Sequence, residues 1–166
     1  RWPEFHSSYL RLCTQFVKHG VGIAYFDSPE DWKFRVGGFA DILIPRQSQA
    51  SENAIDIAVG RRQYHLHELY HFIKNEQAEI KNNDLYTGIQ NPTVDVLHYW
   101  VREIDGSVSH YISAESSPKE FLYKKVSRYE SPEQAYVFFT YGVGSNGTYH
   151  SIRGLGQRIF SHVQTS

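Results

Sequence analysis

Residues 93–113 read TVDVLHYWVREIDGSVSHYIS, in which two β-prone segments flank the dipeptide Asp105-Gly106. Asp-Gly between such segments is typical of a two-residue β-hairpin turn. A hairpin that closes there pairs Glu103 with Val108, and His110 lies two residues beyond Val108 on the second strand. Because side chains alternate along a strand, Glu103 and His110 then project from one face. The sequence therefore predicts an antiparallel hairpin that carries both residues on the same side.

Outside this hairpin, apolar spacing predicts both helices and strands, without a regular βαβ rhythm. The predicted helices span 3–18, 62–80 and 118–129, with a short one at the C-terminal end. The predicted strands span 21–26, 34–45, 54–59 and 136–141. Helix-start patterns with Ser followed by Pro occur at Ser28, Ser117 and Ser131. This mixture predicts one α+β domain over residues 1–166, with a mixed, mostly antiparallel sheet, an active-site helix and flanking short helices.

The composition narrows the class of protein. With 40% hydrophobic and 21% charged residues among 166, the chain is expected to be a soluble globular domain, neither disordered nor membrane-spanning. A net charge of -1 argues against a strongly basic nucleic-acid surface. The single cysteine, Cys13, excludes an internal disulfide and predicts the cytoplasm or another reducing compartment. A chain without Met that begins at Arg1 leads us to expect a processed or excised domain, compatible with a lost targeting segment.

Residues 67–71 read HELYH, an H-E-x-x-H pattern within the predicted helix 62–80. Residues four apart lie one turn apart on the same face of a helix, so His67 and His71 can share one zinc ion. The carboxylate of Glu68 beside them can take a proton from a metal-bound water. The pattern predicts a zinc-dependent hydrolase in which His67 and His71 hold the metal and Glu68 is the general base.

These three residues resemble the active-site motif of the zincin metallopeptidases. The order of elements before the motif, a helix and about three strands, is similar to the minimal zincin core. The resemblance implies a peptidase with a peptide or protein substrate, which adds as a strand to the sheet edge beside the helix. It does not extend to the metzincin branch, because Lys74 and Gln77 stand where that pattern requires glycine and histidine.

A third zinc ligand has to come from another element, because Glu79 lies about 12 Å beyond His71 along a continuous helix. The hairpin offers Glu103 as the first candidate and His110 as the second. In the thermolysin-like pattern, too, a later Glu completes the site. The competing interpretation is that Glu103 is a solvated charge beside the turn.

His65 and His67 also form an H-x-H pair, which resembles the metal-binding motif of the HUH endonucleases that cut single-stranded DNA. By that resemblance His65 is an alternative metal ligand and Tyr123 the alternative nucleophile. The residue at the position of that family's lysine is Val126. This departure and the net charge make nucleic acid the less favoured partner.

Two further alternatives remain open at the level of sequence. The Gly-rich stretch 141–148 could cradle an anion with its N–H groups, although a turn at Asn146-Gly147 is the favoured interpretation. The main rival to the hydrolase is a non-enzymatic protein-interaction or assembly module, for example a viral or effector-type domain. The sequence leaves the oligomeric state undetermined.

Overall fold

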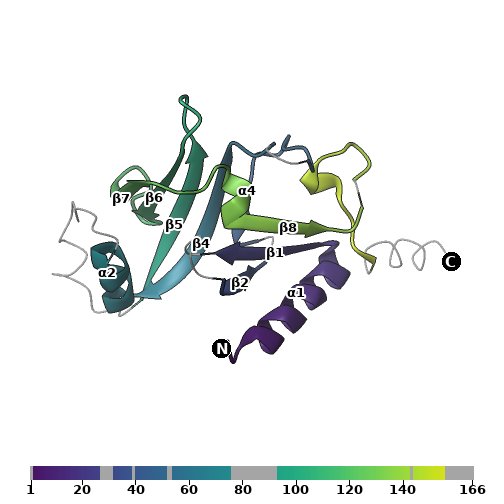
Figure 1. The fold of residues 1–166 in the computed structure, drawn as a ribbon, viewed down its shortest axis with the longest axis horizontal. Helices are drawn as coiled ribbons and strands as arrows, with labels where there is room; N and C mark the ends of the chain where they lie inside the picture. The colour runs from purple at the N-terminus through teal and green to yellow at the C-terminus, as the bar shows by residue number, and fades with distance from the viewer. Residues whose placement is uncertain are drawn as a thin grey trace.

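The structure, a computed structural model, describes residues 2–26, 32–38, 40–51, 54–75, 93–142 and 144–155. These residues form two antiparallel sheets with helices beside them (Figure 1). The larger sheet has the strand order β3-β4-β5-β6-β7, and the smaller has the order β2-β1-β8. The α+β prediction is therefore confirmed, and every described strand pair is antiparallel.

The larger sheet is built from β3 (Ile42–Leu43), β4 (Ile57–His65), β5 (Thr93–Arg102), β6 (Val108–Ala114) and β7 (Phe121–Val126). The smaller sheet comprises β2 (Phe34–Gly37), β1 (Val21–Phe26) and β8 (Tyr136–Thr140). Helix α1 (Phe5–His19) packs on β1 and β2, whereas α2 (Leu66–Asn75) directly continues β4. The short α4 (Pro132–Ala135) leads into β8, and a 3-10 turn, η1 (Tyr149–Ser151), follows it.

Both hydrophobic clusters lie on the same face of the larger sheet. One cluster packs Ala58 and Trp100 of this sheet against Ile23 and Tyr136 of the smaller sheet. The other packs Leu69 and Ile73 of α2 against strand residues that include Val96 and Ile112. Their burial supplies the main driving force for folding. All described covering elements thus lie on one face, which we call the core face, and the opposite face is called the outer face.

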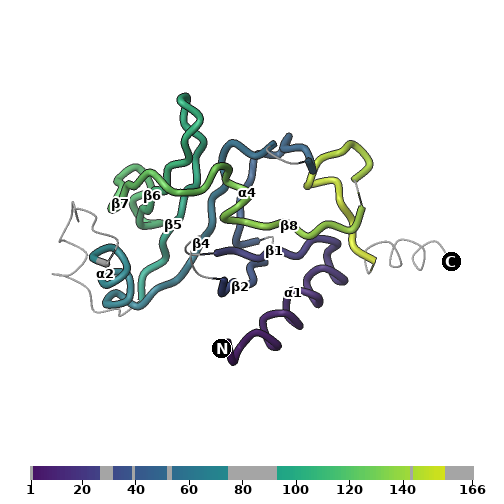
Figure 2. Tube along the Cα trace, viewed as in Figure 1, coloured from purple at the N-terminus to yellow at the C-terminus, as the bar shows by residue number. Residues whose placement is uncertain are grey.

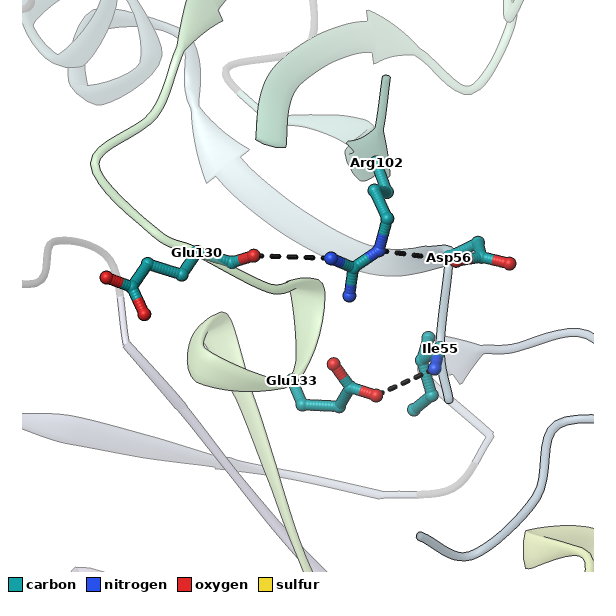
Figure 3. Close-up of polar contacts among 5 residues, drawn as sticks. All are labelled: Ile55, Asp56, Arg102, Glu130 and Glu133. Atoms are coloured by element: carbon teal, nitrogen blue, oxygen red, sulfur yellow. Dashed lines mark hydrogen bonds and ion pairs between the residues drawn. The ribbon is translucent and has the colours of Figure 1, made fainter. Parts of the chain in front are cut away.

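Polar contacts join α4 to the point where β4 begins (Figure 3). The backbone N–H of Ile55 donates to a carboxylate oxygen of Glu133 at 2.7 Å. The guanidinium of Arg102, at the end of β5, lies 3.3 Å from Asp56 and donates to the carbonyl of Glu130 at 3.4 Å. These contacts tie the α4 segment to the larger sheet, although α4 precedes a strand of the smaller sheet.

The hairpin forms, but its register differs by one residue from the prediction. Trp100 pairs with His110, and the loop contains three residues, Ile104, Asp105 and Gly106. Gly106 takes a φ of 85° after a turn closed by its N–H to the Glu103 carbonyl, which is the three-residue loop with a glycine bulge. A shift of one residue moves a side chain to the opposite face. Glu103 and His110 therefore do not share a face.

Two predicted helices are wrong in part. Residues 121–126 form strand β7 in place of a helix over 118–129, because their backbone completes the edge of the sheet against β6. Only a turn at Ser117 remains of the predicted helix start, with the Glu120 N–H bonded to the Ser117 carbonyl at 3.1 Å. Residues 62–65 extend β4, so α2 begins at Leu66. The predicted parts at Ser28, beyond Asn75 and at the C-terminal end lie outside the described residues.

Candidate functional site

The H-E-x-x-H residues do lie on a helix, in the first turn and a half of α2. His67, Glu68 and His71 are all exposed to solvent, whereas Leu69 and Ile73 of the same helix are buried. The helix is therefore amphipathic, with the histidine side turned away from the core.

Glu68 has a structural partner in the helix itself. One of its carboxylate oxygens accepts the backbone N–H of His65 at 3.2 Å. A Glu three residues into a helix that reaches back to the N-cap N–H is one half of a capping box. The imidazole ring of His65 stacks on that of His67, with centroids 5.7 Å apart. These contacts explain the local sequence HLHEL as the start of a helix.

Glu103 lies far from this motif, at the other end of β5. His65, just before α2, pairs with Thr93 at the beginning of β5, and Glu103 stands ten residues further along the chain. At about 3.3 Å per residue this places Glu103 about 33 Å from the start of α2. Figure 2 shows the tip of this hairpin and α2 at opposite ends of the strands. The structure does not bring Glu103 to the predicted zinc site.

His110 is also separated from the motif, because it is buried inside the fold. Its ring lies parallel to the ring of Trp100 with centroids 4.0 Å apart, and its Nε2 lies 2.9 Å from Nδ1 of His98. Burial lowers the pKa of His110 to about 3, with Arg62 and Lys125 contributing, so the ring is neutral at pH 7. It is a core residue on the side opposite to Glu103.

Tyr123, the alternative nucleophile, is equally buried. Its side chain is 3% exposed, and its ring contacts Phe72 and His110 at centroid distances of 6.2 and 5.2 Å. Tyr123 lies on the core face, whereas His65 projects from the outer face at the end of β4. The H-x-H pair and this tyrosine are not brought together.

Among the described residues, no three His, Cys, Asp or Glu side chains come close enough to hold a metal ion. His67 and His71 therefore have no third protein ligand within that part of the chain. The acids Glu76 and Glu79 lie outside it. Zinc binding and hydrolysis remain predictions from the motif.

The outer face of the larger sheet carries apolar and aromatic side chains, and no described element covers it. Strand pairing aligns its side chains in three rows across the sheet. These rows are Leu43–Val59–Tyr99–Tyr111–Lys124, Ile57–Val101–Ser109–Val126 and Arg61–Leu97–Ser113–Phe121. Leu43 and Val126 are 60% and 59% exposed at the two sides of the sheet. A contiguous apolar patch with charges at its rim is typical of a protein-protein interface.

Aromatic and charged side chains on this face hold one another in place. The ring of Phe121 contacts those of Tyr99 and Tyr111, with centroids 5.8 and 4.9 Å apart. The Tyr111 hydroxyl donates to Glu103 at 2.5 Å, and the Lys124 ammonium lies 5.1 Å from the Tyr111 ring centroid. The hydrogen bond from Tyr111 lowers the pKa of Glu103, and Tyr111 raises the pKa of Lys124. Glu103 thus orients an aromatic residue of the outer face.

The sequence contained only part of the signal for this face. Alternation along 93–102 predicts that Leu97, Tyr99 and Val101 share one side. The sequence does not predict the contribution of residues 121–126, because their pattern favours a helix.

No known protein family matches the sequence, and no curated protein is detectably similar to it. Within the described residues, no helix has both the length and the apolar character that a membrane crossing requires.

Proposed function

We propose that this chain is a non-catalytic assembly module that self-associates through the outer face of its larger sheet. The observation that carries this proposal is the set of apolar and aromatic side chains on that face, which no described element covers. Burying such a surface against a like surface removes apolar area from water, the main source of affinity between proteins.

The charges on this face favour a protein partner over nucleic acid. Arg61 lies 3.0 Å from Glu115 and 3.6 Å from Asp95, and Tyr111 together with the charge of Glu103 raises the pKa of Lys124. Each cation is therefore balanced by acids within the same chain. A nucleic-acid surface needs an excess of Lys and Arg that neutralises phosphates. A neutral apolar face is compatible with a second copy of itself, since no like charges have to be buried.

The size of the face suits a weak dimer. Five strands about 4.8 Å apart, with side-chain rows along about 20 Å of strand, cover roughly 400 Å² in projection. Two such faces with their side-chain relief bury about 1,000 Å² in total, near the lower limit for a specific interface. We therefore expect association at micromolar concentrations, through one self-complementary contact with two-fold symmetry.

Sedimentation-velocity measurements across a concentration series test this proposal. The wild-type chain is expected to shift from monomer to dimer between about 1 and 100 µM. Val126→Glu puts a charge on the apolar outer face, at its β7 side, and is expected to weaken dimerisation at least about tenfold. The matched control is Val17→Glu on α1, since Val17 is 55% exposed but lies on a different surface. A wild-type chain that remains monomeric at 100 µM, or equal effects of both variants, overturns the proposal.

A further inference from the structure

Two segments that are distant in sequence meet to form a polar cleft, away from the larger sheet's outer face. Residues 46–49 form one wall, and residues 144–153 form the other. A β-bridge between Gln49 and Thr148 joins the walls, together with a hydrogen bond from the Ala50 N–H to the Gly147 carbonyl at 2.8 Å. The cleft has a volume of about 1270 Å³, which is larger than a free inorganic ion requires.

The lining of the cleft is cationic. It contains the guanidinium groups of Arg46 and Arg153, and the other lining residues are histidine, uncharged polar residues and glycine, without a carboxylate. Among the described residues, no carboxylate lies within ion-pair distance of Arg46 or Arg153. Guanidinium groups normally pair with carboxylate or phosphate oxygens, and a concave site with two of them attracts anions.

Contacts within the second wall fix its shape before any ligand binds. Nη1 of Arg153 donates to the carbonyls of His150 and Ile152 at 2.9 and 3.1 Å, which orients the guanidinium. The Asn146 side-chain oxygen accepts both the N–H and the hydroxyl of Thr148, at 3.2 and 2.7 Å. An ordered wall loses little conformational entropy when a ligand binds.

The backbone of the wall formed by residues 144–153 also offers hydrogen-bond donors for an anion. A Cβ on Gly144 would overlap the Ser151 side chain, so glycine is required for the loop to pack this closely. The N–H groups of Ser145 and Asn146, at the tip of the turn, have no acceptor within the described part of the chain. Backbone N–H groups in such a turn are donors for an anion.

We propose that this cleft binds a phosphate monoester carried on an extended protein segment. A phosphate group with nearly two negative charges matches the two arginines. The volume leaves room for the ligand residues on either side of the phosphorylated one. The side-chain amides of Gln47, Gln49 and Asn146 offer hydrogen-bonding groups for the backbone of the bound segment. No Phe, Tyr or Trp lines the cleft, so it lacks the large aromatic rings on which the bases of single-stranded nucleic acid stack.

Amide chemical-shift titrations of the ¹⁵N-labelled full chain test this assignment. The probes are a short alanine-rich peptide with one central phosphoserine, the same peptide with serine, and a short oligothymidylate. The phosphopeptide is expected to shift residues 46–49 and 144–153 saturably at millimolar concentrations or below, and the serine peptide is not. Arg46→Gln and Arg153→Gln are each expected to weaken binding about tenfold, since each removes a charge-assisted hydrogen-bond partner.

Two controls separate this site from general charge attraction. Arg11→Gln makes the same charge change on exposed α1, outside the cleft, and is expected to leave affinity unchanged. Arg46→Lys keeps the charge without the bidentate geometry, so it is expected to bind with intermediate affinity. The absence of saturable shifts, equal effects of Arg11→Gln and Arg46→Gln, or tighter binding of oligothymidylate than of phosphopeptide would overturn the proposal.

Discussion

Acidification from pH 7 to pH 5 is expected to destabilise this protein through two buried histidines. His98 and His110 are 1% and 5% exposed, and their facing ring nitrogens lie 2.9 Å apart. One of these nitrogens must donate a proton to the other, so the hydrogen bond is lost when both rings are protonated. The charged groups that act on the pair are cations, Arg62 on both rings, Arg35 on His98 and Lys125 on His110. Protonation within the folded state is therefore unfavourable.

The sign and size of the effect follow from the pKa of each state. Burial lowers the pKa of His110 to about 3, below its value of 6.5 in an unfolded chain, and burial likewise lowers the pKa of His98. In this interval the unfolded chain binds more protons, so the free energy of unfolding falls as the pH falls below 6.5. Each pH unit below 6.5 costs about 1.4 kcal/mol, so His110 alone lowers stability by about 2 kcal/mol at pH 5. His98 acts in the same direction.

The buried histidines and the carboxylates change the stability of the protein in different pH ranges. Hydrogen bonds from Tyr111 and Ser107 lower the pKa values of Glu103 and Asp105, respectively, below 4.5 and 3.8. Stability from these acids is present above those values and is lost only as the pH falls through their folded pKa. The loss between pH 7 and pH 5 is thus expected to come from the buried histidines.

Urea unfolding at pH 7 and pH 5, followed by tryptophan fluorescence, measures this loss. The double variant His98→Phe/His110→Phe replaces both partners with apolar rings, so no buried donor is left without an acceptor. Its free energy of unfolding is expected to change by less than about 0.5 kcal/mol between the two pH values. The control His6→Gln removes an exposed histidine and should retain the full loss. A wild-type chain equally stable at both pH values, or an equal loss in the double variant, would refute the reasoning.

Two further predictions concern the H-E-x-x-H segment. If the zincin resemblance is functional, untagged protein will contain about one zinc per chain. The variant His67→Ala will then lose both the metal and any chelator-sensitive peptide hydrolysis, whereas a metal-free and inactive wild-type protein would contradict this prediction. Glu68→Ala removes the carboxylate that accepts the His65 N–H, so urea unfolding should show that the free energy of unfolding falls by about 0.5–1 kcal/mol. Glu68→Gln keeps an acceptor and should keep most of this stability, whereas an unchanged unfolding midpoint in Glu68→Ala would argue against the cap.

The elements that could be predicted from sequence are those defined by local spacing. The helix predicted over 3–18 spans Phe5–His19, and the strand predicted over 21–26 has those bounds in the structure. The strand predicted over 136–141 spans Tyr136–Thr140. In each case the apolar pattern and a nearby turn residue agree, so local preference and tertiary packing favour the same structure. The amphipathic character of α2 was predictable for the same reason.

The segments that failed are those whose structure depends on distant partners. Residues 121–126 contain Phe121, Leu122 and Tyr123, an apolar run whose length and spacing fit either a helix or a strand. Pairing with β6 decides for the strand, and a local window contains no information about β6. Likewise, residues 62–65 join β4 because Arg62 and Tyr64 pair with Val96 and Val94 across the sheet.

The register of the hairpin between β5 and β6 decides which face of the sheet carries Glu103 and which carries His110. With a two-residue turn, Glu103 and His110 would share a face and could both approach a ligand. The three-residue loop with Gly106 at positive φ sends Glu103 to the outer face, where it binds Tyr111, and His110 to the core, beside Trp100. The same one-residue shift therefore separates the two candidate third zinc ligands, and it places Glu103 on the ordered outer face and His110 in the acid-sensitive histidine pair. A four-residue pattern such as H-E-x-x-H specifies only two ligands and a base, and the rest of a metal site depends on this kind of non-local register.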